Sequence, residues 1–208
     1  MTSSSVVRRF DHPAGSSVTD MRRILVTGNA GAGKTSVAHI LSTHTNLPCV
    51  GLDKVVWKPG WLRTSAVERR ASEEAIAKAP CWIVDGVSMV MLQAADTIIF
   101  LDYPRHRCFW RALWRNMPHL FRSRPGLPAR CPEIRIAPTL VKIIWNFPAL
   151  VRPRILDACQ NDSKRFIHIR TNQELSQFMA TLGATWPKAK LSTRSGNRRR
   201  NHSPEEIP

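Results

Sequence analysis

The sequence predicts an α/β fold in which a five-stranded parallel sheet is covered by helices on both faces. Two observations support this prediction. Short apolar segments alternate along the chain with segments of helical periodicity, which is typical of parallel sheets. The first apolar segment, 23–27, leads through a glycine-rich turn directly into a helical pattern. With 208 residues, of which 43% are hydrophobic, the chain can fill the core of one such domain.

The individual elements follow from apolar runs, capping signals and prolines. Strands are expected at 23–27, 48–53, 81–86, 96–102 and 166–169. Helices are expected over 34–43, 64–79, 104–115 and 172–182. Ser65 and Glu68 fit a capping box at the start of the second helix, and Pro104 suits the first turn of the third. The segment 116–140 contains five prolines and is expected to be the least regular part of the domain.

The chain divides into one domain and two tails. Residues 1–20 and the basic tail 184–208 are polar, and both are expected to be disordered. The domain occupies 21–183 and carries a basic insert over about 105–154. No run of 18 apolar residues exists, so no membrane span is expected. Five widely spaced cysteines without a C-x-x-C pair favour free thiols in a reducing cytosol, and hence a cytoplasmic location.

Positive charge is the strongest feature of the composition. The chain has 31 Lys and Arg residues against 15 Asp and Glu residues, a formal net charge of +16. The basic insert alone contains eleven Lys or Arg residues and one acidic residue, Glu133. Such a field attracts polyanions, whether nucleotides, nucleic acid or acidic lipid headgroups. Composition does not choose among them.

The glycine-rich turn fits the phosphate-loop pattern G-x-x-x-x-G-K-[ST] in full. Glycines allow consecutive backbone N–H groups to point inward at phosphate, and the following helix adds the positive end of its dipole. The predicted ligands are a nucleoside triphosphate, taken to be ATP, and Mg²⁺. Lys34 is expected to reach the β- and γ-phosphates, and the Thr35 hydroxyl to bind the Mg²⁺ ion. The loop consists of Gly28, Asn29, Ala30, Gly31, Ala32, Gly33, Lys34 and Thr35.

Three acidic residues end predicted strands and are candidates for the chemistry beyond phosphate binding. They are Asp53, Asp85 and Asp102, and the carboxyl ends of parallel strands line the binding crevice of such sheets. Each can bind Mg²⁺ through water or accept a proton from an acceptor hydroxyl. Each can equally be a helix cap or a turn residue, and Asp85-Gly86 is a good turn pair. Asp53 is the preferred functional candidate. The absence of N-K-x-D weighs against a GTPase, and no strand ends in the Asp-Glu pair of many hydrolysing motors.

The helix expected after the fourth strand carries Arg107, Arg111 and Arg115 at intervals of four residues, so that they form one stripe. A positioned arginine can stabilise the negative charge that spreads over oxygens during phosphoryl transfer. The basic, proline-rich segment that follows has the composition of a lid that excludes water from the reaction. The alternative is a solvated basic face.

Several segments together form a more specific pattern than the phosphate loop alone. They are RILVTGNAGAGKTSVA, GLDKVVWKPGW, WIVDG, DTIIFLDYPRHRCFWRALWR, RCPE and RPRIL. In order and spacing they resemble the adenylate-kinase-related proteins of the DNA topology modulation (FlaR-type) family. The resemblance covers about 22–179, which is nearly all of the chain except the tails.

This resemblance implies a P-loop NTPase fold of the nucleotide-kinase type, with strand order 2-3-1-4-5 and a basic helical lid. It also implies an ATP site at the phosphate loop and functional residues at Asp53, Arg105, Arg111 and Arg115. The sequence departs from the family pattern at Val56 and Val87, where the family usually has a tyrosine nearby and an aromatic or polar residue, respectively. Both departures concern the acceptor site.

The sequence therefore favours a kinase that transfers the γ-phosphoryl group of MgATP to a small acceptor such as a nucleotide or nucleoside. In this interpretation Asp53 and the nearby Trp57 and Trp61 lie close to the acceptor, although the tryptophans can equally anchor a loop. One alternative is a nucleotide-dependent protein that binds nucleic acid non-specifically through its basic insert and influences DNA topology. The other is a simple ATPase.

Overall fold

The computed structural model describes residues 21–117, 133–159 and 164–183. Its centre is a five-stranded sheet in which every pair of neighbouring strands is parallel. The spatial order is β2-β5-β1-β6-β7, which is 2-3-1-4-5 when these strands are counted along the chain, as expected. The strands are β1 (Arg23–Gly28), β2 (Cys49–Gly51), β5 (Trp82–Asp85), β6 (Thr97–Leu101) and β7 (Arg165–Ile169).

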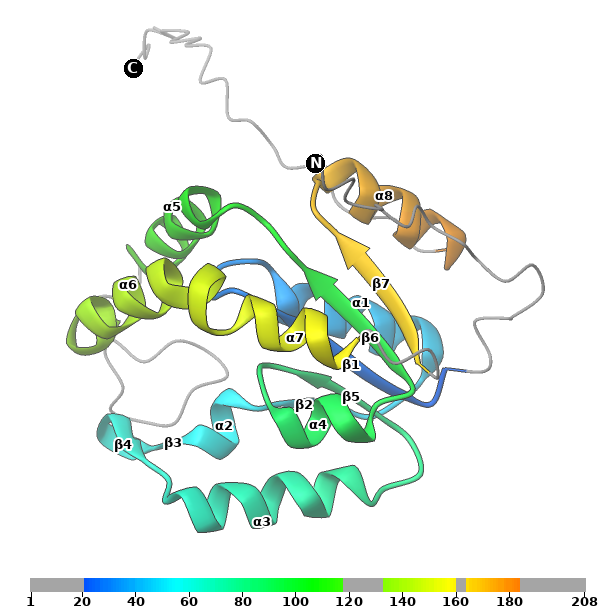
Figure 1. The fold of residues 1–208 in the computed structure, drawn as a ribbon, viewed down its shortest axis with the longest axis horizontal. Coiled ribbons are helices and arrows are strands. Elements are labelled where there is room, and N and C mark those ends of the chain that lie inside the picture. The colour runs from blue at the N-terminus through cyan, green and yellow to red at the C-terminus, as the bar shows by residue number, and fades with distance from the viewer. Residues whose placement is uncertain (1–20, 118–132, 160–163, 184–208) are drawn as a thin grey trace, which may run out of the picture.

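Eight α-helices lie within the described ranges, and most of them connect or flank the strands (Figure 1). They are α1 (Lys34–Thr45), α2 (Asp53–Val56), α3 (Ala66–Ala77), α4 (Met89–Ala94), α5 (Arg105–Asn116), α6 (Glu133–Leu150), α7 (Arg152–Ala158) and α8 (Asn172–Thr181). A small antiparallel pair, β3 (Trp57–Lys58) and β4 (Leu62–Arg63), is joined by a 3₁₀ turn over Pro59–Trp61. None of the described helices combines the length and the apolar character needed to cross a bilayer.

Side chains that alternate along the strands build one apolar cluster on each face of the sheet. In β1, Ile24 and Val26 belong to the cluster with α1 and α8, whereas Leu25 belongs to the cluster with α4 and α7. All three are fully buried. The sheet is therefore covered on both faces, which explains why its strands are continuous apolar runs.

The predicted capping box at the start of α3 is confirmed. The Ser65 hydroxyl accepts a hydrogen bond from the Glu68 backbone N–H, and the Glu68 carboxylate accepts one from the Ser65 backbone N–H. These bonds satisfy two backbone donors that the first helical turn leaves without partners.

Helix α6 corrects the expectation that 116–140 is irregular, because the helix occupies its last part, from Glu133 onward. It contains Pro138 and Pro148, residues that normally interrupt helices. Ile144 and Phe147 of this helix are buried against the core, and this packing outweighs the cost of the prolines. Most of the remaining segment, 118–132, lies outside the described residues, as do both predicted tails.

Two short elements also differ from the prediction. The second strand ends at Gly51 rather than at Asp53, and Asp53 instead opens the one-turn helix α2. Helix α4, between the third and fourth strands of the sheet, and the β3–β4 hairpin were not expected. Each is too short to give a recognisable period in the sequence.

Candidate active site

The predicted phosphate loop connects the carboxyl end of β1 with the amino end of α1. Gly28, Gly31 and Gly33 have φ angles of 146°, 82° and 96°, a region that side chains disfavour. A Cβ atom at Gly28 would lie 2.5 Å from the carbonyl oxygen of Leu101, and one at Gly31 would overlap the carbonyl oxygen of Cys108. The glycines are therefore needed both for the shape of the loop and for its close approach to β6 and α5.

Lys34 lies on the loop, where its Nζ donates a hydrogen bond of 2.9 Å to the carbonyl oxygen of Asn29. Burial lowers the pKa of Lys34 below its usual value. The charges of Asp53 and Asp85 oppose this shift, whereas that of Arg115 adds to it. Four residues from four parts of the chain thus act on one another electrostatically around the start of α1.

A hydrogen bond between Thr35 and Asp85 links the loop to a neighbouring strand. The Thr35 hydroxyl donates to Asp85 Oδ2 at 2.6 Å, and the Asp85 carboxyl is buried at the carboxyl end of β5. Burial raises the pKa of Asp85, although the hydrogen bond from Thr35 and the charge of Lys34 counteract this shift. A hydroxyl and a carboxylate side by side are oxygen donors of the kind that Mg²⁺ prefers.

From the sequence alone, Asp85 is a weaker candidate for a functional acid than Asp53. The parallel register of β1 with β5 pairs Val26 with Asp85, and this pairing brings the end of β5 beside the loop. The sequence signal was an acid that ends a strand directly before glycine. The same Asp85-Gly86 pair is equally typical of a turn.

Asp53 is the first residue of α2, directly beyond the end of β2. Its charge raises the pKa of Lys34 and that of Asp85, so it belongs to the same electrostatic group. The structure therefore brings Asp53, Lys34 and Asp85 together. The role of Asp53 toward an acceptor stays a prediction.

Arg111 of α5 points its guanidinium at the start of α1. Its Nη2 would lie 3.4 Å from a Cβ atom at Gly33, and its Cζ is 5.6 Å from the centre of the Tyr103 ring. Its Nη1 is buried and has no hydrogen-bond partner within the described ranges. An unsatisfied buried donor of a cationic group is costly unless a ligand completes it. Arg111 thus offers a buried donor beside the phosphate loop.

The other arginines of α5 differ in what they contact. Arg115 is close enough to Lys34 to lower its pKa, whereas Arg107 lies over the Tyr103 ring at 5.0 Å. Arg105 lies over the ring of Trp145 at 4.6 Å, a contact that joins α5 to α6 and does not involve the loop. The predicted stripe therefore places Arg111 and Arg115 at the site, while Arg105 makes a contact between helices.

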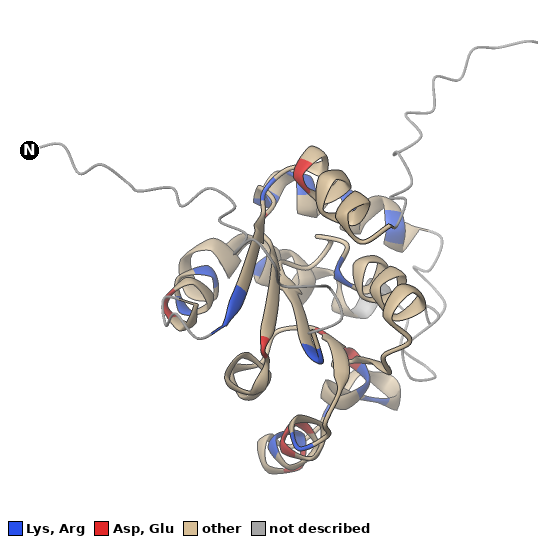
Figure 2. Cartoon of the chain, turned by 90° about the vertical axis from the view of Figure 1, so that its right-hand side faces the viewer, with Lys and Arg blue, Asp and Glu red and all other residues tan. Residues whose placement is uncertain are grey.

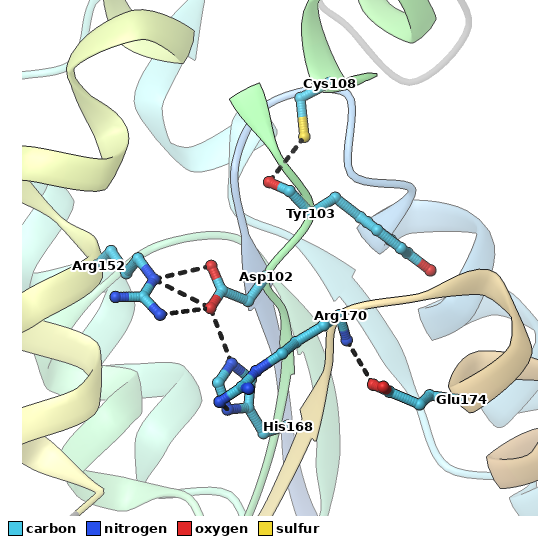
Figure 3. Close-up of polar contacts among 7 residues, drawn as sticks. All are labelled: Asp102, Tyr103, Cys108, Arg152, His168, Arg170 and Glu174. Atoms are coloured by element: carbon cyan, nitrogen blue, oxygen red, sulfur yellow. Dashed lines mark hydrogen bonds and ion pairs between the residues drawn. The ribbon is translucent and has the colours of Figure 1, made fainter. Parts of the chain in front are cut away.

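Asp102 is held at the end of β6 by two basic residues, as Figure 3 shows. Arg152 donates to both carboxylate oxygens at 2.9–3.0 Å, and His168 Nε2 lies 2.8 Å from Oδ2. Burial alone would raise the pKa of Asp102, but the bonds to His168 and Arg152 hold it below its usual value. An arginine cannot accept a hydrogen bond, so in the 3.3 Å contact Arg170 donates and His168 Nδ1 accepts. The ring proton of His168 is therefore on Nε2, which faces Asp102. We call Asp102, Arg152 and His168 the Asp102 clamp.

Trp57 and Trp61 lie on the β3–β4 hairpin and contact each other edge to face, with ring centres 5.2 Å apart. The Arg63 guanidinium lies over the Trp57 ring at 5.6 Å. This pair stabilises the hairpin that follows α2, since such aromatic pairs contribute about 0.5–1.5 kcal/mol beyond the area they bury. It also leaves two aromatic rings close to Asp53 in the sequence.

Comparison with solved structures finds proteins of similar fold. A shikimate kinase from Acinetobacter baumannii in complex with shikimate superposes with a TM-score of 0.50 and 12% sequence identity, over 79% of this chain and 95% of that one. A shikimate kinase from Bacteroides thetaiotaomicron gives a TM-score of 0.46 with 16% identity, over 78% and 99% of the two chains. A gluconokinase from Sinorhizobium meliloti 1021 gives 0.45 with 14% identity, over 78% and 91%.

At this low sequence identity, the comparison supports a similar fold and nothing more specific. No protein-family model matches the chain, and no curated protein does. The first of the solved structures, together with the parallel sheet of order 2-3-1-4-5 and the loop between β1 and α1, identifies a P-loop kinase-like fold.

Proposed function

We propose that this protein is a P-loop kinase that transfers the γ-phosphoryl group of MgATP to a small-molecule acceptor, such as a nucleotide or nucleoside. The observation that carries this proposal is the convergence at the start of α1. Lys34, the Thr35–Asp85 pair and the Arg111 guanidinium, whose Nη1 has no partner within the described ranges, meet there. They come from the loop, from β5 and from α5.

Each group has a distinct task in such a transfer. The backbone N–H groups of the loop and the positive end of α1 bind the phosphate chain. Lys34 exchanges its bond to the Asn29 carbonyl for phosphate oxygens. Arg111 and Arg115 stabilise the charge that develops on the transferred group. Asp53 accepts the proton of an acceptor hydroxyl, or orients the acceptor when that is a phosphate.

Magnesium fits the donors present. Thr35 and Asp85 would hold the ion, directly or through water, and a bound Mg²⁺ neutralises charge on the phosphate oxygens. In the described part of the chain, no three His, Cys, Asp or Glu side chains cluster closely enough to bind a metal ion by themselves. This agrees with an ion held mainly by phosphates and water, as is usual for Mg²⁺ in kinases.

Membership of the DNA topology modulation (FlaR-type) family is part of the same proposal, as are a cytoplasmic location and a lid built from the basic insert 105–154. The nucleic-acid alternative lacks a comparable observation. Figure 2 shows that the basic residues of the described ranges are distributed over several helices and strand ends.

The test is an acceptor screen. Nucleosides, nucleoside monophosphates, sugars and small alcohols are incubated with MgATP, and ADP release is compared with that in water alone, while mass spectrometry detects the phosphorylated acceptor. The proposal expects at least one acceptor to raise ADP release and to gain a phosphoryl group, with no product from Lys34→Ala. ADP release that no acceptor changes would instead identify an ATPase.

A further inference from the structure

The carbonyl oxygen of Ile144 in α6 lacks the helical partner that such a group normally has. In an α-helix this oxygen accepts a hydrogen bond from the N–H four residues later. That residue is Pro148, which lies inside the helix and has no N–H. Ile144 is 1% exposed, so water does not take the place of the missing donor.

The phosphate loop supplies the missing donor. Asn29 Nδ2 donates to the Ile144 carbonyl oxygen at 3.0 Å, and Asn29 is itself 1% exposed. Its Oδ1 accepts from the Ala30 backbone N–H at 2.8 Å, which fixes the orientation of the amide. Ala30 and Ala32 of the loop pack in the same apolar cluster as Ile144. The loop and the middle of α6 are thus in direct contact.

The same residue also holds Lys34. The Asn29 backbone carbonyl accepts hydrogen bonds from Lys34 Nζ at 2.9 Å and from the Ala32 N–H at 3.1 Å. One side of Asn29 therefore binds α6, and the other side binds the lysine and the turn of the loop. Helix α6 in turn packs on α5, which carries Arg111.

We infer that Asn29 is a positioning residue that locks the phosphate loop to α6 through the carbonyl group that Pro148 leaves without a donor. The lock fixes the distance between the loop, with Lys34, and the α5–α6 pair, with Arg111. This inference rests on the proposed kinase function for its catalytic consequence, but not for the lock itself.

Two substitutions affect the lock from opposite sides. Asn29→Ala removes the donor that the loop supplies to the buried Ile144 carbonyl, so the melting temperature should fall by about 4–8 °C. Pro148→Ala restores an N–H that can bond this carbonyl within the helix. The protein should then melt at the same or a higher temperature, while the Ile144 carbonyl is no longer held by the Asn29 amide in place of the helical N–H.

The decisive experiment combines the two substitutions and follows both stability and turnover. In the double variant the backbone N–H that Pro148→Ala introduces satisfies the Ile144 carbonyl, so at least half of the melting-temperature loss caused by Asn29→Ala should be recovered. Turnover should respond differently. Each single variant and the double variant should show a kcat about 10–100-fold below that of the wild type, with the KM for ATP changed less, because misplaced groups act on the transition state.

Pro80→Ala is the control, since it replaces an exposed proline outside the basic insert 105–154 and should leave kcat unchanged. A merely structural role of Asn29 would move stability and kcat together, whereas the lock requires Pro148→Ala to be slower without being less stable. Additive melting temperatures in the double variant would overturn the inference, whether or not the wild type turns over. If the temperatures couple but the wild type binds no nucleotide, the proposed function fails and the lock stands.

Discussion

At the scale of single residues, burial shifts the protonation of Asp85 at the proposed metal site, and the hydrogen bond from Thr35 opposes this shift. Burial raises the pKa of Asp85, and a raised pKa in the folded state means that folding favours the neutral carboxyl. The stability that this group contributes is thus present at low pH and is lost as the pH rises through its folded pKa. Mg²⁺ requires the opposite, charged form.

The affinity for MgATP should therefore fall when the pH is lowered through the raised pKa of Asp85, above the range of an ordinary aspartate. Asp85→Asn should lower Mg²⁺ affinity by about 10–100-fold and should abolish this pH dependence. Magnesium titrations of ATP binding at several pH values measure both effects. Asp157→Asn, on the exposed side of α7, is the control. A variant that keeps the wild-type pH profile would exclude Asp85 from the metal site.

Arg111 carries a buried donor beside the loop, because its Nη1 has no hydrogen-bond partner within the described ranges. The negative charge that Arg111 would stabilise develops on the phosphoryl group only during the transfer. Arg111→Ala should therefore lower kcat by about 10³-fold, while the KM for ATP changes only a few-fold. Steady-state kinetics with the identified acceptor provide the measurement. Arg70→Ala, in an exposed ion pair with Glu74 on α3, should be neutral. An unchanged kcat for Arg111→Ala would remove it from the reaction.

The comparison of Asp53 with Asp85 shows which part of the candidate site could not be predicted from the sequence. The position and backbone geometry of the predicted phosphate loop could be anticipated, because its glycine spacing acts locally. Sequence alone could not decide whether Asp53 or Asp85 is the functional acid. That choice depends on the pairing of β1 with β5, which joins residues far apart in the chain.

At the scale of elements, the Asp102 clamp joins three of them: the end of β6, the start of α7 and β7. Asp102 gains two hydrogen-bonded basic partners on folding, and its pKa is lowered. A lowered pKa means that this carboxylate contributes stability above its unfolded pKa, and that the contribution is lost as the pH falls through the folded value.

Asp102→Asn should therefore destabilise the protein at neutral pH by about 1–3 kcal/mol, since the charged bonds to Arg152 and His168 are lost. The difference between variant and wild type should shrink as the pH falls through the lowered pKa of Asp102. Urea unfolding at neutral and at acidic pH measures this free energy. A difference that is the same at both pH values would show that the charge of Asp102 does not matter.

Elements with strong local signals could be predicted, and those held by tertiary contacts could not. The capping box of α3 and the entry of the phosphate loop into α1 depend on neighbouring residues. Helix α6 contains two prolines, which the sequence alone interprets as interruptions. It persists because Ile144 and Phe147 are buried and because the loop donates to the carbonyl that one proline leaves unpaired.

At the scale of the whole molecule, the fold gathers the candidate residues at the carboxyl ends of the parallel strands. The loop follows β1, Asp53 lies beyond β2, Asp85 ends β5 and Asp102 follows β6 (Figure 1). Open α/β sheets bind ligands at this edge. The net charge of +16 adds a general attraction for anions, which suits a triphosphate ligand.

A ligand that binds the folded state alone should also stabilise the whole molecule. With MgATP at 100 times its dissociation constant, the stabilisation amounts to about 2.7 kcal/mol, or roughly 5–10 °C in melting temperature for a chain of this size. Thermal unfolding with and without MgATP measures the shift. Gly33→Val should abolish it, because Gly33 has a φ angle of 96° at the start of α1. An equal shift in that variant would place the nucleotide elsewhere.

The most direct test of the proposed nucleotide site is a calorimetric titration of the wild type and Lys34→Ala with MgATP. We expect a saturable heat for the wild type and none for Lys34→Ala. We also expect wild-type behaviour for Lys78→Ala, which changes an exposed lysine at the end of α3. If the wild type gave no heat with ATP or with any other nucleoside triphosphate, the phosphate loop would not be a nucleotide site and the proposed kinase would be contradicted.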